Sequence, residues 1–101
     1  MPGTIDLILP ASVRAGAPFI ASVDVKSAPA GAELTVYLEQ RRGPGPRWTL
    51  QTEAATASPA GAASATFSVA LAGPGDAVLV ATARDHAGTF FAPDAESVEV
   101  R

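Results

Sequence analysis

The feature that most constrains the fold of this chain is a period-two alternation of apolar and polar residues. It recurs in three well separated segments, residues 19–26, 34–39 and 63–71. Successive side chains of a strand point to opposite faces of a sheet, so such alternation indicates strands with one buried face. Clusters of glycine and proline separate these segments at intervals of roughly ten residues, a spacing typical of a sandwich. We therefore predict an all-β protein, an immunoglobulin-like antiparallel β-sandwich of seven or eight strands.

The inward faces can be assigned from the parity of each segment. The residues expected in the core are Phe19, Ala21, Val23, Val25, Leu34, Val36, Leu38, Ala63, Ala65, Phe67, Val69 and Leu71. The segment 77–83 is apolar at both parities, which is expected of a central strand with both faces covered. The same parity argument applied to residues 47–53 places Trp48 on the core side.

The length of the chain sets its domain organisation. With 101 residues, 48% of them hydrophobic, it can form one domain with a single two-layer core. We expect residues 1–10 to form an N-terminal arm or first edge strand, and residues 11–101 to form the sandwich. No signal peptide is seen, because the apolar run from Ile5 to Leu9 lacks a basic flank. No stretch is long enough to insert in a membrane.

The segment EQRRGPGPRWTL, residues 39–50, gathers three of the seven basic residues beside the only tryptophan. Two alternating segments flank it, so a long hairpin loop is the simplest interpretation. A nucleic-acid site is disfavoured, because the chain carries a net charge of −3. A proline-rich ligand is disfavoured because the spaced P-x-x-P pattern is missing. A contact of this loop with a protein partner remains open.

Catalytic and metal-binding patterns are weak. The chain has no cysteine, and His86, its only histidine, is next to Asp85 on a predicted turn where neighbouring side chains diverge. The aspartates are scattered singly, and the AGPGD turn has no lysine or following helix to bind a phosphate. We therefore predict no enzyme activity, no cofactor and no metal. An enzyme would come back into consideration if the fold formed a cleft that holds His86 with a distant carboxylate.

The pattern from ELTVYLEQRRGPGPRWTLQ, through GPGDAVLVATARDHAG, to SVEV resembles bacterial immunoglobulin-like, or prealbumin-like, domains over about residues 11–101. In those domains a strand ending in a polar pair leads through a glycine loop to a Trp-Thr strand, and a later strand closes on Ala-x-Ala. The resemblance implies the sandwich fold. It carries no active site, since domains of this kind serve many roles.

Apolar residues on the expected outer faces are the main functional signal. Together with the basic loop they give a set of candidate partner-contact residues, namely Ile8, Ile20, Tyr37, Val78, Val80, Phe91, Arg41, Arg42 and Arg47. If they cluster, they would form a patch for a protein partner or for self-association. The resulting hypothesis is a non-catalytic structural or interaction module, such as a virion decoration or tail-associated protein or a subunit of a surface array. A virion or another extracellular assembly is the favoured location.

The alternative hypothesis is an adhesive or carbohydrate-binding module of a larger cell-surface protein. Its contacts would come from Tyr37, Trp48 and the arginine loop, because sugar sites use exposed aromatic platforms with polar neighbours. Only 6% of the residues are aromatic, which makes this alternative the weaker one.

Overall fold

A computed structural model describes residues 3–41 and 46–101 of the chain. It confirms the all-β prediction, with eight strands in the described residues. The strands are β1 (Thr4–Ile8), β2 (Ser12–Val13), β3 (Phe19–Lys26), β4 (Glu33–Arg41), β5 (Arg47–Thr56), β6 (Ala63–Val69), β7 (Gly75–Asp85) and β8 (Asp94–Val100). No helix in the described part of the chain is both long and apolar enough to cross a membrane.

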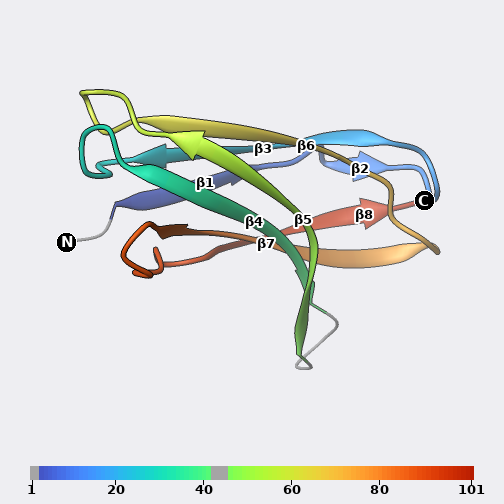
Figure 1. The fold of residues 1–101 in the computed structure, drawn as a ribbon. Coiled ribbons are helices and arrows are strands. Elements are labelled where there is room, and N and C mark those ends of the chain that lie inside the picture. Colours follow the sequence, from blue (N-terminus) through green and yellow to red (C-terminus); the bar gives the residue numbers. More distant parts are fainter. Residues whose placement is uncertain (1–2, 42–45) are drawn as a thin grey trace.

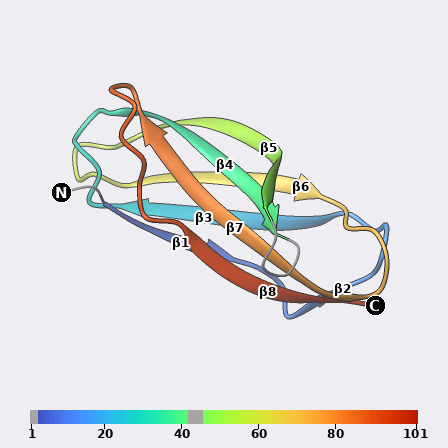
Figure 2. The same cartoon turned by 90° about the horizontal axis from the view of Figure 1, so that it is seen from below.

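The strands form two sheets that face one another (Figure 1). The smaller sheet has the order β1-β3-β6, and the larger has the order β2-β8-β7-β4-β5. In Figure 2 the larger sheet lies in front of the smaller one, with β7 running across the middle. The sheets are not wholly antiparallel as predicted, because the short strand β2 pairs with β8 in parallel.

The core lies between the sheets and is built from the predicted alternating positions. Residues 21, 23 and 25 of β3, 34, 36 and 38 of β4, and 65, 67 and 69 of β6 are all buried. The central strand β7 lies between β4 and β8, and residues 79–83 are buried at both parities. The expectation of a strand covered on both faces is therefore confirmed over this stretch.

Two side chains of the larger sheet bind the edges of the smaller one. The Asp94 carboxylate of β8 accepts a hydrogen bond from the Leu7 N–H of β1 at 2.8 Å. On the other side, the Gln51 amide of β5 donates to the Ser68 carbonyl of β6. Each bond engages a backbone group on an outer strand of the smaller sheet. The two sheets are therefore linked by a side-chain hydrogen bond at each edge of the smaller sheet.

Trp48 is 40% exposed, so it is not buried in the core as predicted. The register of β4 and β5 shifts at Leu38 and Glu39, so that Leu50 has no partner on β4. Beyond this bulge Trp48 lies opposite Gln40, on the face of β4 that also carries Leu38, but the hairpin end extends away from the other strands (Figure 1). The smaller sheet does not reach this end, so the indole ring is left partly in solvent.

The segment after β7 folds back along the larger sheet and forms no strand at residues 89–92. A single bridge joins Arg84 to Phe90. The Thr82 hydroxyl donates to the Phe91 carbonyl at 3.0 Å, and the Phe91 N–H donates to the Ala83 carbonyl at 2.8 Å. These bonds bury Phe91 and leave Phe90 exposed, which corrects the choice of Phe91 as a surface residue.

Candidate functional site

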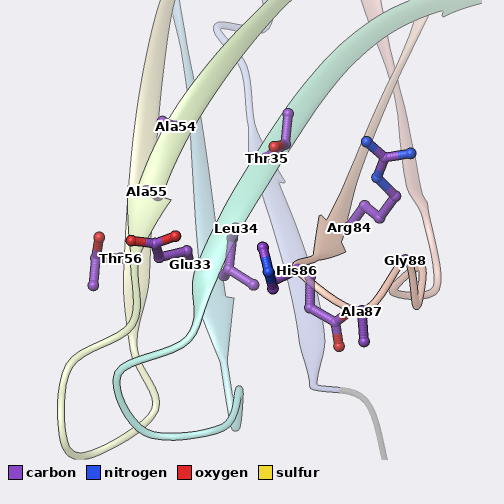
Figure 3. Close-up of a pocket in the computed structure, with 11 residues that line it drawn as sticks. Glu33, Leu34, Thr35, Ala54, Ala55, Thr56, Arg84, His86, Ala87 and Gly88 are labelled. Atoms are coloured by element: carbon purple, nitrogen blue, oxygen red, sulfur yellow. The ribbon is translucent and has the colours of Figure 1, made fainter.

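A groove of about 620 Å³ lies at one end of β4, β5 and β7 (Figure 3). Its floor is set by the sheet register, in which Glu33 lies opposite Thr56 and Thr35 lies between Ala54 and Arg84. Because Leu34 points into the core, Glu33 and Thr35 point outward. The groove is therefore on the outer face of the larger sheet.

A tight turn at residues 85–88 forms one wall of the groove. The Asp85 carboxylate accepts a hydrogen bond from the Thr89 N–H at 2.9 Å, and the Asp85 N–H donates to the Thr89 carbonyl at 3.0 Å. Gly88 has a φ of 89° and donates to the Asp85 carbonyl, a conformation that glycine adopts without steric cost. Asp85 therefore holds the turn, and the turn places His86 at the groove.

His86 lies between Glu33 and Arg84 in the close-up view (Figure 3). Glu33 comes from β4, so the fold brings a carboxylate distant in sequence to the same groove as the only histidine. A groove that holds His86 with a distant carboxylate is the arrangement that brings an enzyme back into consideration. Sequence reasoning missed Glu33, because a single glutamate at the start of an alternating strand carries no pattern of its own.

Arg84, the second-to-last residue of β7, places a positive charge at the groove. Its guanidinium carbon lies 5.8 Å from the centre of the Phe90 ring, and that ring is 6.2 Å from the ring of Tyr37. Stacking of this kind orients a guanidinium while leaving its N–H groups free for an acceptor. Within the described residues Arg84 forms no ion pair.

The residues predicted to contact a partner do not form one patch. Ile8 and Ile20 are exposed on the outer face of the smaller sheet, whereas Tyr37 and Val78 belong to the larger sheet. Val80 is only 2% exposed, so the expectation that it lies on the surface is wrong, as it is for Phe91.

The basic residues of this set lie on the hairpin. Arg41 and Arg47 are directly opposite one another near its end, and Arg47 is 3.6 Å from the Glu39 carboxylate. Arg42 lies outside the described residues. Whether any of these positions contacts a partner stays a prediction.

No protein-family model matches this chain, and no curated protein matches its sequence. Solved structures with a similar fold include the superoxide reductase (neelaredoxin) of Ignicoccus hospitalis, at 20% identity and a TM-score of 0.64 over 100% of this chain and 81% of that one. Two of its single-substitution variants match with TM-scores of 0.68 and 0.69, at 21% and 20% identity, over 97% and 98% of this chain and 80% and 81% of theirs. At this level of identity the likeness establishes the fold.

This likeness corrects three interpretations of the sequence. The resemblance to bacterial immunoglobulin-like domains is wrong, because the structural neighbours are superoxide reductases. The non-catalytic module, whether a virion component or a cell-surface adhesive or carbohydrate-binding unit, is contradicted because these neighbours are superoxide reductases. The expectation of no enzyme activity is contradicted on the same ground.

The residues of this chain do not fit the metal that such neighbours imply. Catalytic metal sites in proteins commonly use three protein ligands, drawn largely from histidine, cysteine and carboxylate side chains. This chain has no cysteine and one histidine, and its described residues contain no group of three or more such side chains that could hold a metal ion. The groove therefore offers the chemistry of its own side chains, those of Glu33, Thr35, Thr56, Arg84 and His86.

Proposed function

We propose that this chain is an enzyme whose reactive site is the groove at residues 33–35, 54–56 and 84–88. In this proposal His86 transfers a proton to or from a small polar substrate. The observation that supports this proposal is that His86 and Glu33, which are distant in sequence, line one solvent-accessible groove. Imidazole is the side chain that most readily both accepts and donates a proton near neutral pH.

The remaining groove residues would bind and orient the substrate. Arg84 can attract an anionic group, and the hydroxyls of Thr35 and Thr56 can donate or accept hydrogen bonds. Asp85 acts through the turn, because its carboxylate already accepts the Thr89 N–H. A rigid turn at this point would keep the imidazole in place during proton transfer.

The fold supports a role in oxidoreductase chemistry, because the structural neighbours carry the name superoxide reductase. Any electrons would come from a component other than the described residues, since these lack a metal-ligand set. The finer description of the fold as an immunoglobulin-like sandwich is also a proposal, supported by the two facing sheets.

The proposal can be tested through the single histidine. Its imidazole C–H protons give one set of NMR signals, so a panel of small polar compounds can be screened for those that shift them. Compounds that bind are then followed for chemical conversion. We expect His86→Gln to retain binding and to lower the conversion rate by about 100-fold or more, the size of a general acid–base contribution.

Asp76→Asn, near the opposite end of β7, is the matched control and should leave the rate unchanged. Conversion that proceeds equally in His86→Gln would contradict the proposal. So would a panel in which no compound shifts the imidazole signals.

A further inference from the structure

We propose that the groove selects small zwitterions, molecules with an anionic group at one end and a cationic group at the other. This inference rests on the proposed function and names its class of substrate. It follows from the separation of opposite charges along the groove, with Arg84 at one end, Glu33 toward the other, and His86 between them (Figure 3).

The anionic end of the ligand would meet Arg84. The guanidinium is stacked over Phe90 and has no carboxylate partner in the described residues, so its fork of N–H donors is free. A fork of this kind suits a carboxylate or another planar oxyanion, which it can bind through two parallel hydrogen bonds. Thr35, directly opposite on β4, adds a hydroxyl on the same face.

The cationic end would meet Glu33. This carboxylate is exposed, forms no ion pair in the described part of the chain, and lies opposite the hydroxyl-bearing Thr56. The other carboxylate of the groove, Asp85, is already bound to the Thr89 N–H. Glu33 is therefore the acceptor most available for an ammonium group.

The sheet geometry sets the distance between the two ends. Glu33 is two residues along β4 from Thr35, and Thr35 is directly across from Arg84. The rise of two residues along a strand, combined with the spacing between neighbouring strands, puts the backbone positions of Glu33 and Arg84 roughly 8 Å apart. A short chain of carbons between an ammonium and a carboxylate spans this scale, and His86 then lies beside the middle of the ligand.

Three compounds of one chain length separate the contributions of the two ends. They are 4-aminobutanoate, butanoate and butylammonium, and the binding of each is measured by NMR titration of the His86 imidazole signals. We expect the zwitterion to bind about 2- to 5-fold more tightly than either singly charged compound, the modest gain typical of an exposed ion pair.

Two variants test the assignment of the ends. Arg84→Gln should weaken binding of 4-aminobutanoate and butanoate but leave that of butylammonium unchanged. Glu33→Gln should weaken binding of 4-aminobutanoate and butylammonium but leave that of butanoate unchanged. Arg84→Lys keeps the charge without the fork, so it should recover only part of the lost affinity, and thermal unfolding of each variant verifies that it is folded.

Equal binding of butanoate and 4-aminobutanoate would overturn the zwitterion inference. The role of His86 in proton transfer is tested separately by the conversion experiment. If Arg84→Gln and Glu33→Gln both bind 4-aminobutanoate as tightly as the parent chain does, the zwitterion inference is overturned as well. Preference for the zwitterion with no effect of His86→Gln on conversion would instead preserve the ligand class and contradict the proposed function.

Discussion

At the scale of single residues, Thr82 determines how the segment after β7 folds back. Its hydroxyl is buried and donates to the Phe91 carbonyl, next to the residue whose ring stacks with Arg84. Removing this donor leaves a buried carbonyl without its partner. The position of Arg84 at the groove therefore depends on a threonine that lies outside it.

We predict that Thr82→Val lowers the free energy of unfolding by about 1 to 2 kcal/mol, the cost of leaving a buried acceptor unpaired. Thr82→Ser keeps the hydroxyl and should cost less. Chemical denaturation of the two variants beside the parent chain measures the difference. Equal destabilisation by valine and serine would show that the hydrogen bond contributes little.

Glu96 is the described residue whose ionisation is most perturbed by its neighbours. The negative charge of Asp94 raises the pKa of the Glu96 carboxyl, with smaller contributions from partial desolvation, a hydrogen bond to Asp94 and the charge of Asp6. The folded protein thus binds this proton more tightly than the unfolded chain does. Stability conferred by the protonated form is present at acid pH and is lost as the pH rises through the folded-state pKa.

We therefore predict that Glu96→Gln raises the melting temperature at neutral pH. The gain should shrink toward zero as the pH falls below the ordinary range of a glutamate pKa, because the parent carboxyl is then protonated too. Thermal melts between pH 3 and pH 8 measure it. Glu53→Gln, on the exposed edge strand β5, is the control, and a gain that does not depend on pH would refute the electrostatic explanation.

At the scale of elements, the turn at Gly61 joins two loops at one end of the sandwich. Gly61 has a φ of 81°, and its carbonyl accepts a hydrogen bond from the Ala28 N–H at 2.9 Å. A Cβ at this position would lie 2.5 Å from the Ala28 carbonyl oxygen. Gly73 has a similar φ of 74°, but a Cβ there would meet nothing within 4 Å.

This pair of glycines separates conformational strain from steric contact. Gly73→Ala should cost roughly 1 kcal/mol, the penalty of a left-handed conformation for a residue with a Cβ. Gly61→Ala carries the same penalty plus the displacement of the neighbouring backbone, an additional cost of about 1 to 3 kcal/mol. Denaturant titration of both variants gives the two values, and equal losses would show that the loops separate easily.

Most strands could be predicted from the sequence, because burial of one face leaves a period-two pattern. The alternation at Val23 and Val25, and again at Phe67 and Val69, assigned the core correctly. Burial was wrongly predicted at Trp48, because the hairpin end that carries it extends beyond the smaller sheet and its core-side face is left uncovered (Figure 1). The prediction failed again at Phe91, because a hydrogen bond from Thr82 decides which of two adjacent phenylalanines is buried.

At the scale of the whole molecule, the candidate site depends on contacts that no local pattern contains. Glu33 and His86 come together only through the pairing of β4 with β7, in which Leu34 lies opposite Asp85. The sequence could state the condition, a cleft holding His86 and a distant carboxylate. It could not identify the carboxylate, because the chain has ten aspartates and glutamates and only the strand register selects one.

The comparison with superoxide reductases also leads to a prediction for the whole chain. Incubation with a divalent transition-metal ion, followed by desalting, should leave far less than one metal ion per chain, because the described residues lack a set of three ligands. Metal analysis and thermal unfolding with and without the metal ion test this. One metal ion that survives desalting and raises the melting temperature would show that the chain forms a metal site after all.

The groove beside His86 is the proposed substrate-binding site of this protein. Backbone amide NMR with 4-aminobutanoate, or with any compound that the protein converts, maps the binding site over the whole molecule. We predict that the largest shifts fall at residues 33–35, 54–56 and 84–88, and that the Arg84→Gln, Glu33→Gln double variant needs a higher concentration of 4-aminobutanoate to reach the same shifts. Shifts centred on the hollow beside Gly73 and Arg41, or on the one beside Lys26 and Ser64, would contradict this prediction.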